Sequence, residues 1–204
     1  MDCDKHIEQI KKVSDSIKPG VVTILTGKNG SGKSLIRKLI ASYIAEKLNL
    51  DKNKPCAASI SMESRTQRKH EFLALCAIGI DEPDNPTSYE TLHNIDSLIQ
   101  SSCKIESPRY LIIDEPEIGM GEEMVASLLI RLNNSFNPLP EGCLGVLIIT
   151  HNRYLVEHLI GDFANIEDMT RQEWLNRKII PTDIEEYKEN AMKLNREIYK
   201  RTKQ

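Results

Sequence analysis

Three short segments carry side chains whose types and spacing could act on a phosphate group. The first is Gly27–Ser34, GKNGSGKS, which fits the phosphate-loop pattern G-x-x-x-x-G-K-[ST]. The second contains the adjacent carboxylates of Asp114 and Glu115, and the third contains His151. Each follows an apolar run directly, so each is expected at the carboxyl end of a strand.

The glycine-rich segment predicts a phosphate cradle. Glycines let successive backbone N–H groups turn toward phosphate oxygens, and the N-terminus of the following helix adds the positive end of a dipole. Lys33 would reach the β- and γ-phosphates, and the Ser34 hydroxyl would hold Mg²⁺. The other loop residues expected to bind the nucleotide are Lys28, Asn29, Gly30, Ser31 and Gly32. A plain glycine turn is the alternative, but a strand before the segment and a helix after it favour the nucleotide site.

The acidic pair predicts metal binding and hydrolysis. A carboxylate at the end of a strand beside the phosphate loop is well placed to hold Mg²⁺, directly or through water, and Asp114 has that position. Glu115 lies one residue further, where it can turn toward the γ-phosphate and polarise an attacking water. An acidic turn after a core strand is the structural alternative.

His151 follows the apolar run Leu144–Thr150. A histidine at the end of a strand is, by itself, more often a structural cap. In a parallel sheet, however, the end of this strand and the end of the Asp114 strand face the same crevice. We therefore expect His151 to hydrogen-bond the γ-phosphate and to sense its presence.

Strands that alternate with helices, each strand nearly continuous in apolar residues, predict an α/β fold with a mostly parallel sheet covered on both faces. Strands are expected at 21–26, 56–62, 109–114 and 144–150. Helices are expected at 4–18, 35–48, 71–80, 88–102, 122–135, 151–160 and 183–202. The predicted ATPase domain covers 1–166 and a C-terminal helical extension covers 167–204, with a capping-box spacing at Thr170–Glu173.

The composition of the chain limits the partners and the cellular location that are expected for this site. The 204 residues carry a formal net charge of −3, which gives no overall basic footprint for nucleic acid but leaves a local patch open. No apolar run approaches the ~20 residues of a membrane helix, and the N-terminus lacks a signal-peptide pattern. We expect a cytoplasmic protein. The five cysteines form no C-x-x-C pair and indicate neither a zinc site nor a disulfide framework.

The three motifs in this order resemble the ATP-binding-cassette (ABC) superfamily of ATPases. GKNGSGKS, LIIDEP and ITHN look like its Walker A, Walker B and switch-histidine segments, over roughly residues 20–165. The continuation DEPEIG is more similar to the soluble branches: ATPases of the overcoming-lysogenisation-defect type and the DNA-repair and chromosome-maintenance ATPases. The resemblance implies ATP and Mg²⁺ as cofactors, Lys33 on the phosphates, Ser34 and Asp114 on the metal, Glu115 as catalytic base and His151 as γ-phosphate sensor.

The chain departs from that family in three places. The family's signature loop is missing before the Asp114 strand; the matching region contains Ser88, whose hydroxyl could meet a γ-phosphate across a dimer. The family's glutamine loop corresponds to Gln67, which is equally plausible as a surface residue. No aromatic residue precedes the phosphate loop, so selectivity for adenine is inferred from the family alone.

Three functions remain open at this point. The leading hypothesis is a stand-alone ATPase that acts as an ATP-gated dimer switch, as a homodimer or with a partner protein or nucleic acid. The second is a small-molecule or nucleoside kinase whose lid would use Arg65 and Arg68. The third is a nucleotide-gated binding module with little turnover; its basic cluster, Arg65, Arg68, Lys69 and His70, is small enough to be a solvated helix face.

Overall fold

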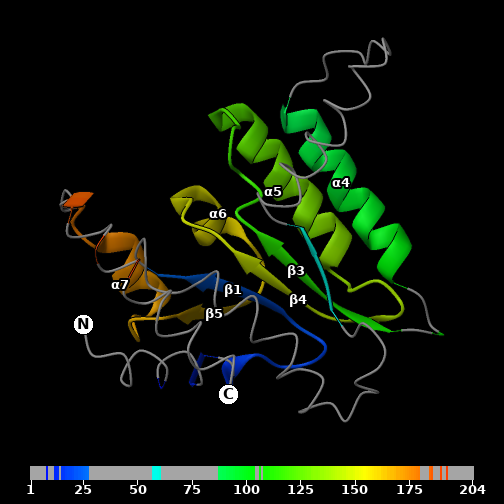
Figure 1. The fold of residues 1–204 in the computed structure, drawn as a ribbon, viewed down its shortest axis with the longest axis horizontal. Coiled ribbons are helices and arrows are strands. Elements are labelled where there is room, and N and C mark those ends of the chain that lie inside the picture. The colour runs from blue at the N-terminus through cyan, green and yellow to red at the C-terminus, as the bar shows by residue number, and fades with distance from the viewer. Residues whose placement is uncertain are drawn as a thin grey trace.

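The fold is built on a parallel sheet. The computed structural model describes residues 8, 12–13, 15–27, 57–60, 87–103, 106, 108–179, 184–185, 189 and 192, with the backbone alone described for 57–60, 87–91 and 94. The strands are β1 (Val22–Thr26), β2 (Ala57–Ile60), β3 (Arg109–Asp114), β4 (Cys143–Ile149) and β5 (Asp162–Asn165). Every pairing among them is parallel, in the order β2-β3-β4-β1-β5 (Figure 1). The predicted α/β class is confirmed.

Two features of the sheet were not predicted from the sequence. No strand order was predicted, and in the structure β4 lies between β1 and β3. A fifth strand, β5, pairs with β1 but was not predicted. Its four residues, DFAN, begin and end with polar side chains, so the segment has no apolar run to mark it.

The sheet is buried on both faces, which explains its continuous apolar strands. Successive side chains point to opposite faces: Ile24 packs in one buried cluster and Leu25 in the other. The first cluster contains helix side chains such as Ile95, Leu128 and Trp174. The second contains Val13 and Ile17 from the N-terminal segment together with β1, β3 and β4 residues.

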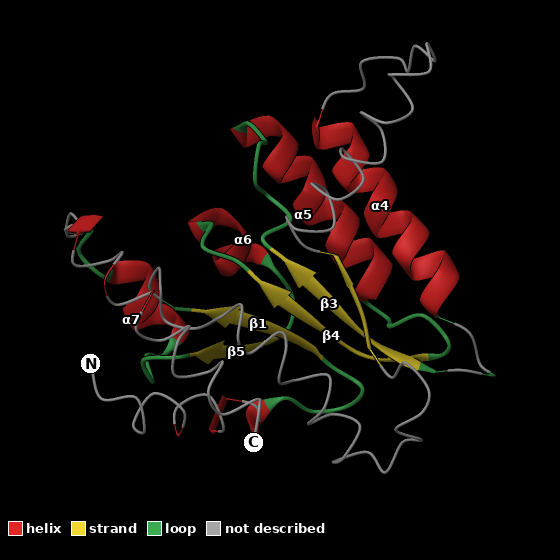
Figure 2. Cartoon of the chain, in the orientation of Figure 1, coloured by secondary structure: helices red, strands yellow, loops and turns green. Residues whose placement is uncertain are grey.

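The described helices are α4 (Thr87–Ser102), α5 (Glu122–Phe136), α6 (Arg153–His158) and α7 (Arg171–Asn176). Figure 2 shows α4 and α5 side by side on one face of the sheet. An ion pair between Arg131 of α5 and Asp96 of α4 links them, with Arg131 Nε 2.9 Å from Asp96 Oδ1. Both helices begin near the edge at which the strands end (Figure 1).

Two predicted helix starts are corrected. Helix α4 begins at Thr87, so Ser88 lies inside the helix rather than capping it. Helix α6 begins only after Asn152, whose side chain accepts a hydrogen bond from the N–H of Leu155. His151 therefore lies in the connection between β4 and α6, where no helix constrains its ring.

Helix α7 begins with the predicted capping box. The Thr170 hydroxyl accepts from the Glu173 N–H, and the Glu173 carboxylate accepts from the Thr170 N–H. The helix buries Trp174 in the first apolar cluster. The predicted helices at 35–48 and 71–80 and most of the one at 183–202 lie outside the described residues. Within the described part of the chain, no helix is long and apolar enough to span a bilayer.

Candidate active site

The carboxyl ends of β1, β3 and β4 meet at one edge of the sheet. Leu25 and Asp114 are both register partners of Ile149, so the three strands end at nearly the same level. The buried Gly27, first residue of the phosphate loop, follows β1 at this edge. With strands spaced about 4.8 Å apart, β1 and β3 lie about 10 Å apart with the end of β4 between them. The phosphate loop therefore begins at the same edge of the sheet at which the acidic pair lies.

Asp114 is the last residue of β3 and is half-buried. A carboxylate oxygen in such a position, completed by phosphate oxygens and water, suits Mg²⁺. The described residues hold no cluster of three or more His, Cys, Asp or Glu side chains that could bind a metal by themselves.

Glu115 leaves the sheet through an unusual backbone conformation. Its φ angle is +48°, in the left-handed region that costs a non-glycine residue of order 1 kcal/mol. Its N–H still donates to the carbonyl of Ile149 at 2.8 Å, so the residue stays attached to β4 while its direction changes. The turn continues with the N–H of Ile118 donating to the carbonyl of Glu115 at 3.3 Å.

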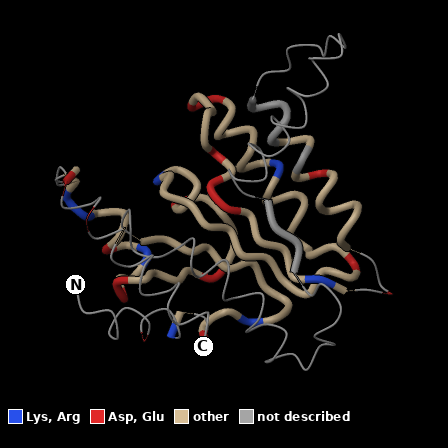
Figure 3. Tube along the Cα trace, in the orientation of Figure 1, with Lys and Arg blue, Asp and Glu red and all other residues tan. Residues whose placement is uncertain are grey.

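This turn brings Glu115 to His151. Glu115 Oε1 lies 3.2 Å from His151 Nε2, and the two side chains are 29% and 27% exposed. A carboxylate that can accept a proton from water thus lies beside an imidazole that can donate a hydrogen bond, and both remain accessible to a ligand. Figure 3 shows that acidic residues are concentrated in the loop after β3, at this edge of the sheet.

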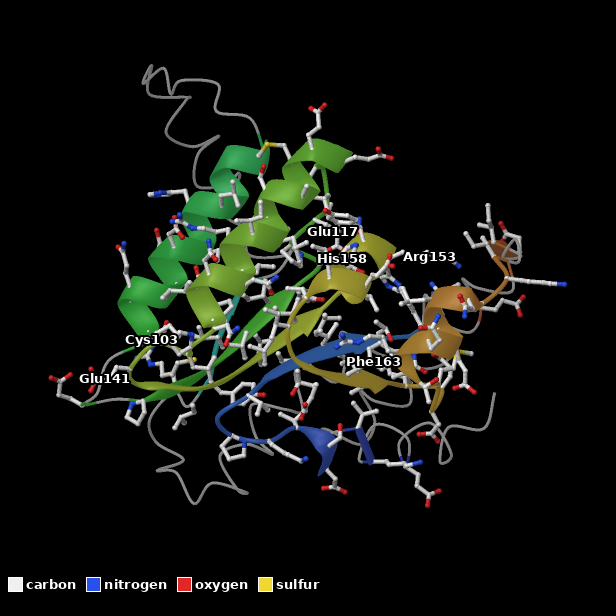
Figure 4. The ribbon with its side chains drawn as sticks, turned by 180° about the vertical axis from the view of Figure 1, so that it is seen from behind. Cys103, Glu117, Glu141, Arg153, His158 and Phe163 are labelled. Atoms are coloured by element: carbon white, nitrogen blue, oxygen red, sulfur yellow. The ribbon has the colours of Figure 1, made fainter. Side chains whose placement is uncertain are left out.

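Glu117 belongs to this site, although the sequence patterns did not single it out. Its Oε1 accepts hydrogen bonds from the Thr150 hydroxyl at 2.6 Å and from the His151 N–H at 3.2 Å. Its Oε2 is buried and has no hydrogen-bond partner among the described residues. Figure 4 labels Glu117 between α5 and α6. The only hint in the sequence was a third carboxylate two residues after the acidic pair.

Asn165, at the end of β5, is the second residue that the sequence patterns missed. Its Nδ2 donates to the Thr26 hydroxyl at 2.9 Å, and its Oδ1 accepts from the N–H groups of Glu167 and Met169. Thr26 and Asn165 are both buried. These contacts hold the end of β1 directly before the phosphate loop.

For the other predicted site residues, the structure describes either nothing or the backbone alone. The loop residues Lys28, Asn29, Gly30, Ser31, Gly32, Lys33 and Ser34, and also Gln67, lie outside the described residues. Only the backbone of Ser88 is described, in the first turn of α4. The structure thus brings Asp114, Glu115 and His151 to the edge of the sheet at which β1 ends.

The sequence is similar to curated ATP-binding proteins. It is 25% identical over 171 residues to the zinc import ATP-binding protein ZnuC of Pseudomonas fluorescens, over 72% of this chain and 63% of that protein. It is 26% identical over 174 residues to ZnuC of Brucella abortus, over 72% and 55% of the two chains. The chain thus spans between about half and two thirds of the length of these relatives. No protein-family model matches it.

Solved structures show weaker likenesses. A chain of the HORMA:CdnC:Trip13 complex from E. coli MS115-1 matches 86% of this chain and 58% of its own length, with 13% identity and a TM-score of 0.46. PCH-2 from C. elegans matches 82% and 41%, with 15% identity and a TM-score of 0.41. These scores are too low to support a statement on function. The sequence relatives confirm the resemblance to ABC-type P-loop ATPases.

Proposed function

We propose that this chain binds ATP together with Mg²⁺ and hydrolyses it to ADP and phosphate. The observation that carries the proposal is the 3.2 Å approach of Glu115 Oε1 to His151 Nε2 beside Gly27. A glycine loop that only held phosphate would need neither group. The names of the sequence relatives, which are ATP-binding proteins, support the same nucleotide.

The roles of the side chains follow from their chemistry. Lys33 and the loop N–H groups would bind the β- and γ-phosphates, and Ser34 with Asp114 would hold Mg²⁺, which supplies charge neutralisation. Glu115 takes a proton from a water molecule as the water oxygen attacks the γ-phosphorus and the bond to the β–γ bridging oxygen breaks. ADP leaves with the electron pair of that bond. His151 donates a hydrogen bond to a γ-phosphate oxygen while that oxygen is present.

We propose further that ATP joins two copies of the chain, or one copy and a partner protein. The γ-phosphate would lie between the loop of one subunit and the start of α4, near Ser88, of the other. Contacts to the γ-phosphate exist only before hydrolysis, so they can bias a closed state over an open one. Nucleic acid is the alternative to a partner protein. Zinc import is the task of the named relatives, and no described residue of this chain assigns it here.

The test of hydrolysis is phosphate release from Mg-ATP by the purified chain, with no phosphate acceptor present. Release that depends on Mg²⁺ supports the ATPase. ATP binding without release would favour the nucleotide-gated binding module. ADP formed only with an added small-molecule acceptor, and without free phosphate, would favour the kinase, because a kinase leaves the phosphoryl group on its acceptor.

Light scattering after size-exclusion chromatography of Glu115→Gln, with and without Mg-ATP, tests the dimer. A shift from monomer to dimer supports the switch between two copies. No shift, with ATP binding verified separately, would direct the search to a partner protein.

A further inference from the structure

Glu117 makes hydrogen bonds that the packing of its own loop does not require. Its turn is closed by hydrogen bonds from the N–H groups of Ile118 and Met120 to the carbonyls of Glu115 and Glu117. Its side chain nevertheless leaves this turn and reaches the end of another strand, where it bonds Thr150 and His151. The carboxylate of Glu117 therefore connects the loop after β3 to the end of β4.

Thr150 is the centre of this connection. It is fully buried, and its N–H donates to the Leu25 carbonyl of β1 at 3.1 Å. Its hydroxyl donates to Glu117 Oε1 and accepts from the N–H of Asn152 at 3.0 Å. One hydroxyl therefore links the β3 loop, the end of β4 and the residue that caps α6.

His151 is consequently held twice by the same loop. Its backbone N–H donates to Glu117, and its ring contacts Glu115. Because residue 151 precedes the α6 cap and lies in no regular element, these contacts decide where the ring points. Loss of the backbone contact would free the ring to leave Glu115.

The second carboxylate oxygen of Glu117 argues against a purely structural role. Glu117 Oε2 is buried without a hydrogen-bond partner among the described residues, and such burial lowers the stability of the fold, more so when the group is charged. An apolar side chain would fill the same space without this cost. A carboxylate therefore stabilises the packing of this loop less than an apolar side chain of the same size would.

We propose that Glu117 is a positioning residue: it fixes the Thr150–His151 backbone so that the imidazole of His151 stays against Glu115. This inference rests on the proposed ATPase function for its effect on turnover. It makes a separate statement about the nucleotide-free protein, in which Glu117 determines the position of the His151 ring.

The kinetic test compares Glu117→Ala with Glu117→Gln. The amide oxygen of glutamine can accept both hydrogen bonds and should retain most of the turnover. Alanine accepts neither, so kcat should fall by about 10- to 100-fold, as for outer-shell residues that orient a reactive group. The KM for ATP should change much less, because the hydrogen bonds of Glu117 go to Thr150 and His151. Equal losses of kcat in the two variants would overturn the proposal.

The second pair of variants changes Thr150, whose hydroxyl donates the hydrogen bond to Glu117. Thr150→Ser keeps the hydroxyl and should behave like wild type, whereas Thr150→Val has nearly the same shape and no donor. Valine should lower kcat as alanine at 117 does, and the double variant should lose little more than either single one. Additive losses would contradict a shared contact. This pair also covers the case in which Glu117→Ala fails to fold.

A nuclear magnetic resonance measurement separates this inference from the proposed function. The ring signals of the five histidines are recorded without nucleotide, and His151→Gln identifies the one from His151. Glu117→Ala and Thr150→Val should move this signal in the same direction as Glu115→Gln, and Glu117→Gln should not. If wild type proves unable to hydrolyse ATP, the ring signal still decides the role of Glu117. An unchanged signal in Glu117→Ala would refute it.

Discussion

Glu115 and His151 leave neighbouring strands and meet with 3.2 Å between Oε1 and Nε2. The contact needs both the parallel pairing of β3 with β4 and the left-handed backbone of Glu115. A right-handed or extended Glu115 would send its side chain elsewhere. The pair is therefore a product of tertiary structure, and its disruption should affect chemistry more than folding.

Glu115→Gln should lower kcat by about 10²- to 10⁴-fold, the usual contribution of a general base, while ATP binding persists. Glutamine keeps the size of the side chain but cannot take the proton from water. Phosphate release and nucleotide binding by calorimetry measure the two effects. Glu122→Gln, an exposed carboxylate in the first turn of α5, is the matched control and should leave kcat unchanged. Wild-type turnover in Glu115→Gln would mean that another group is the base.

Lys33→Ala should weaken ATP binding by roughly 100-fold. The expected loss corresponds to charge-assisted hydrogen bonds to phosphate worth about 3 kcal/mol. Titration with a fluorescent ATP analogue measures the affinity, and the exposed Lys18→Ala should bind as wild type does. Unchanged affinity in Lys33→Ala would show that the glycine segment is an ordinary turn.

Gly145→Ala should destabilise the fold by about 1–3 kcal/mol through overpacking and backbone strain. Gly145 has φ +152°, and a Cβ there would lie 2.5 Å from Cε2 of the buried Tyr110 ring. Urea unfolding monitored by circular dichroism measures the loss. Gly121→Ala meets no atom within 4 Å and should lose less than 1 kcal/mol, as expected for a change at a helix N-cap. Similar losses in both variants would rule out the contact with Tyr110 as the cause.

The free energy of unfolding should fall in alkaline solution. Burial raises the pKa of the Tyr110 hydroxyl above its ordinary value of 10.0 and that of the Cys143 thiol from 9.0 to about 12. The folded state thus favours the neutral forms, and this stabilisation is complete below pH 9. As the pH rises through 10, Tyr110 alone should remove up to about 1.4 kcal/mol per pH unit.

Urea unfolding between pH 8 and 11 tests this slope. Tyr110→Phe should show a shallower decline, because phenylalanine has no proton to lose. Tyr154→Phe is the matched control, since Tyr154 is exposed, and it should follow the wild-type curve. A Tyr110→Phe curve parallel to wild type would exclude Tyr110 as the source.

The sequence was informative where local pattern and structure coincide. Continuous apolar runs identified β1, β3 and β4, because strands buried on both faces have no polar alternation. Strand order was not accessible, since the crossover connections, and not the strands themselves, decide which parallel strands become neighbours. The position of β4 between β1 and β3 is therefore known from the structure alone.

Contacts between residues far apart in the sequence could not be predicted either. Glu117 looks like any loop carboxylate until the pairing of β3 with β4 brings Thr150 to it. Asn165 ends a strand too short to have a pattern, and its partner Thr26 lies near the other end of the chain. Both residues act through neighbours that only the folded chain supplies.

The place of β1 in the sheet has a consequence for synthesis. Both strands that pair with it, β4 and β5, come late in the chain, so the early-made β1 emerges from the ribosome with both edges unpaired. The N–H and C=O groups of one edge gain partners once β4 has been added, and those of the other edge only after Asn165. The end of β1 thus gains its contact with Asn165 only after most of the chain has been made.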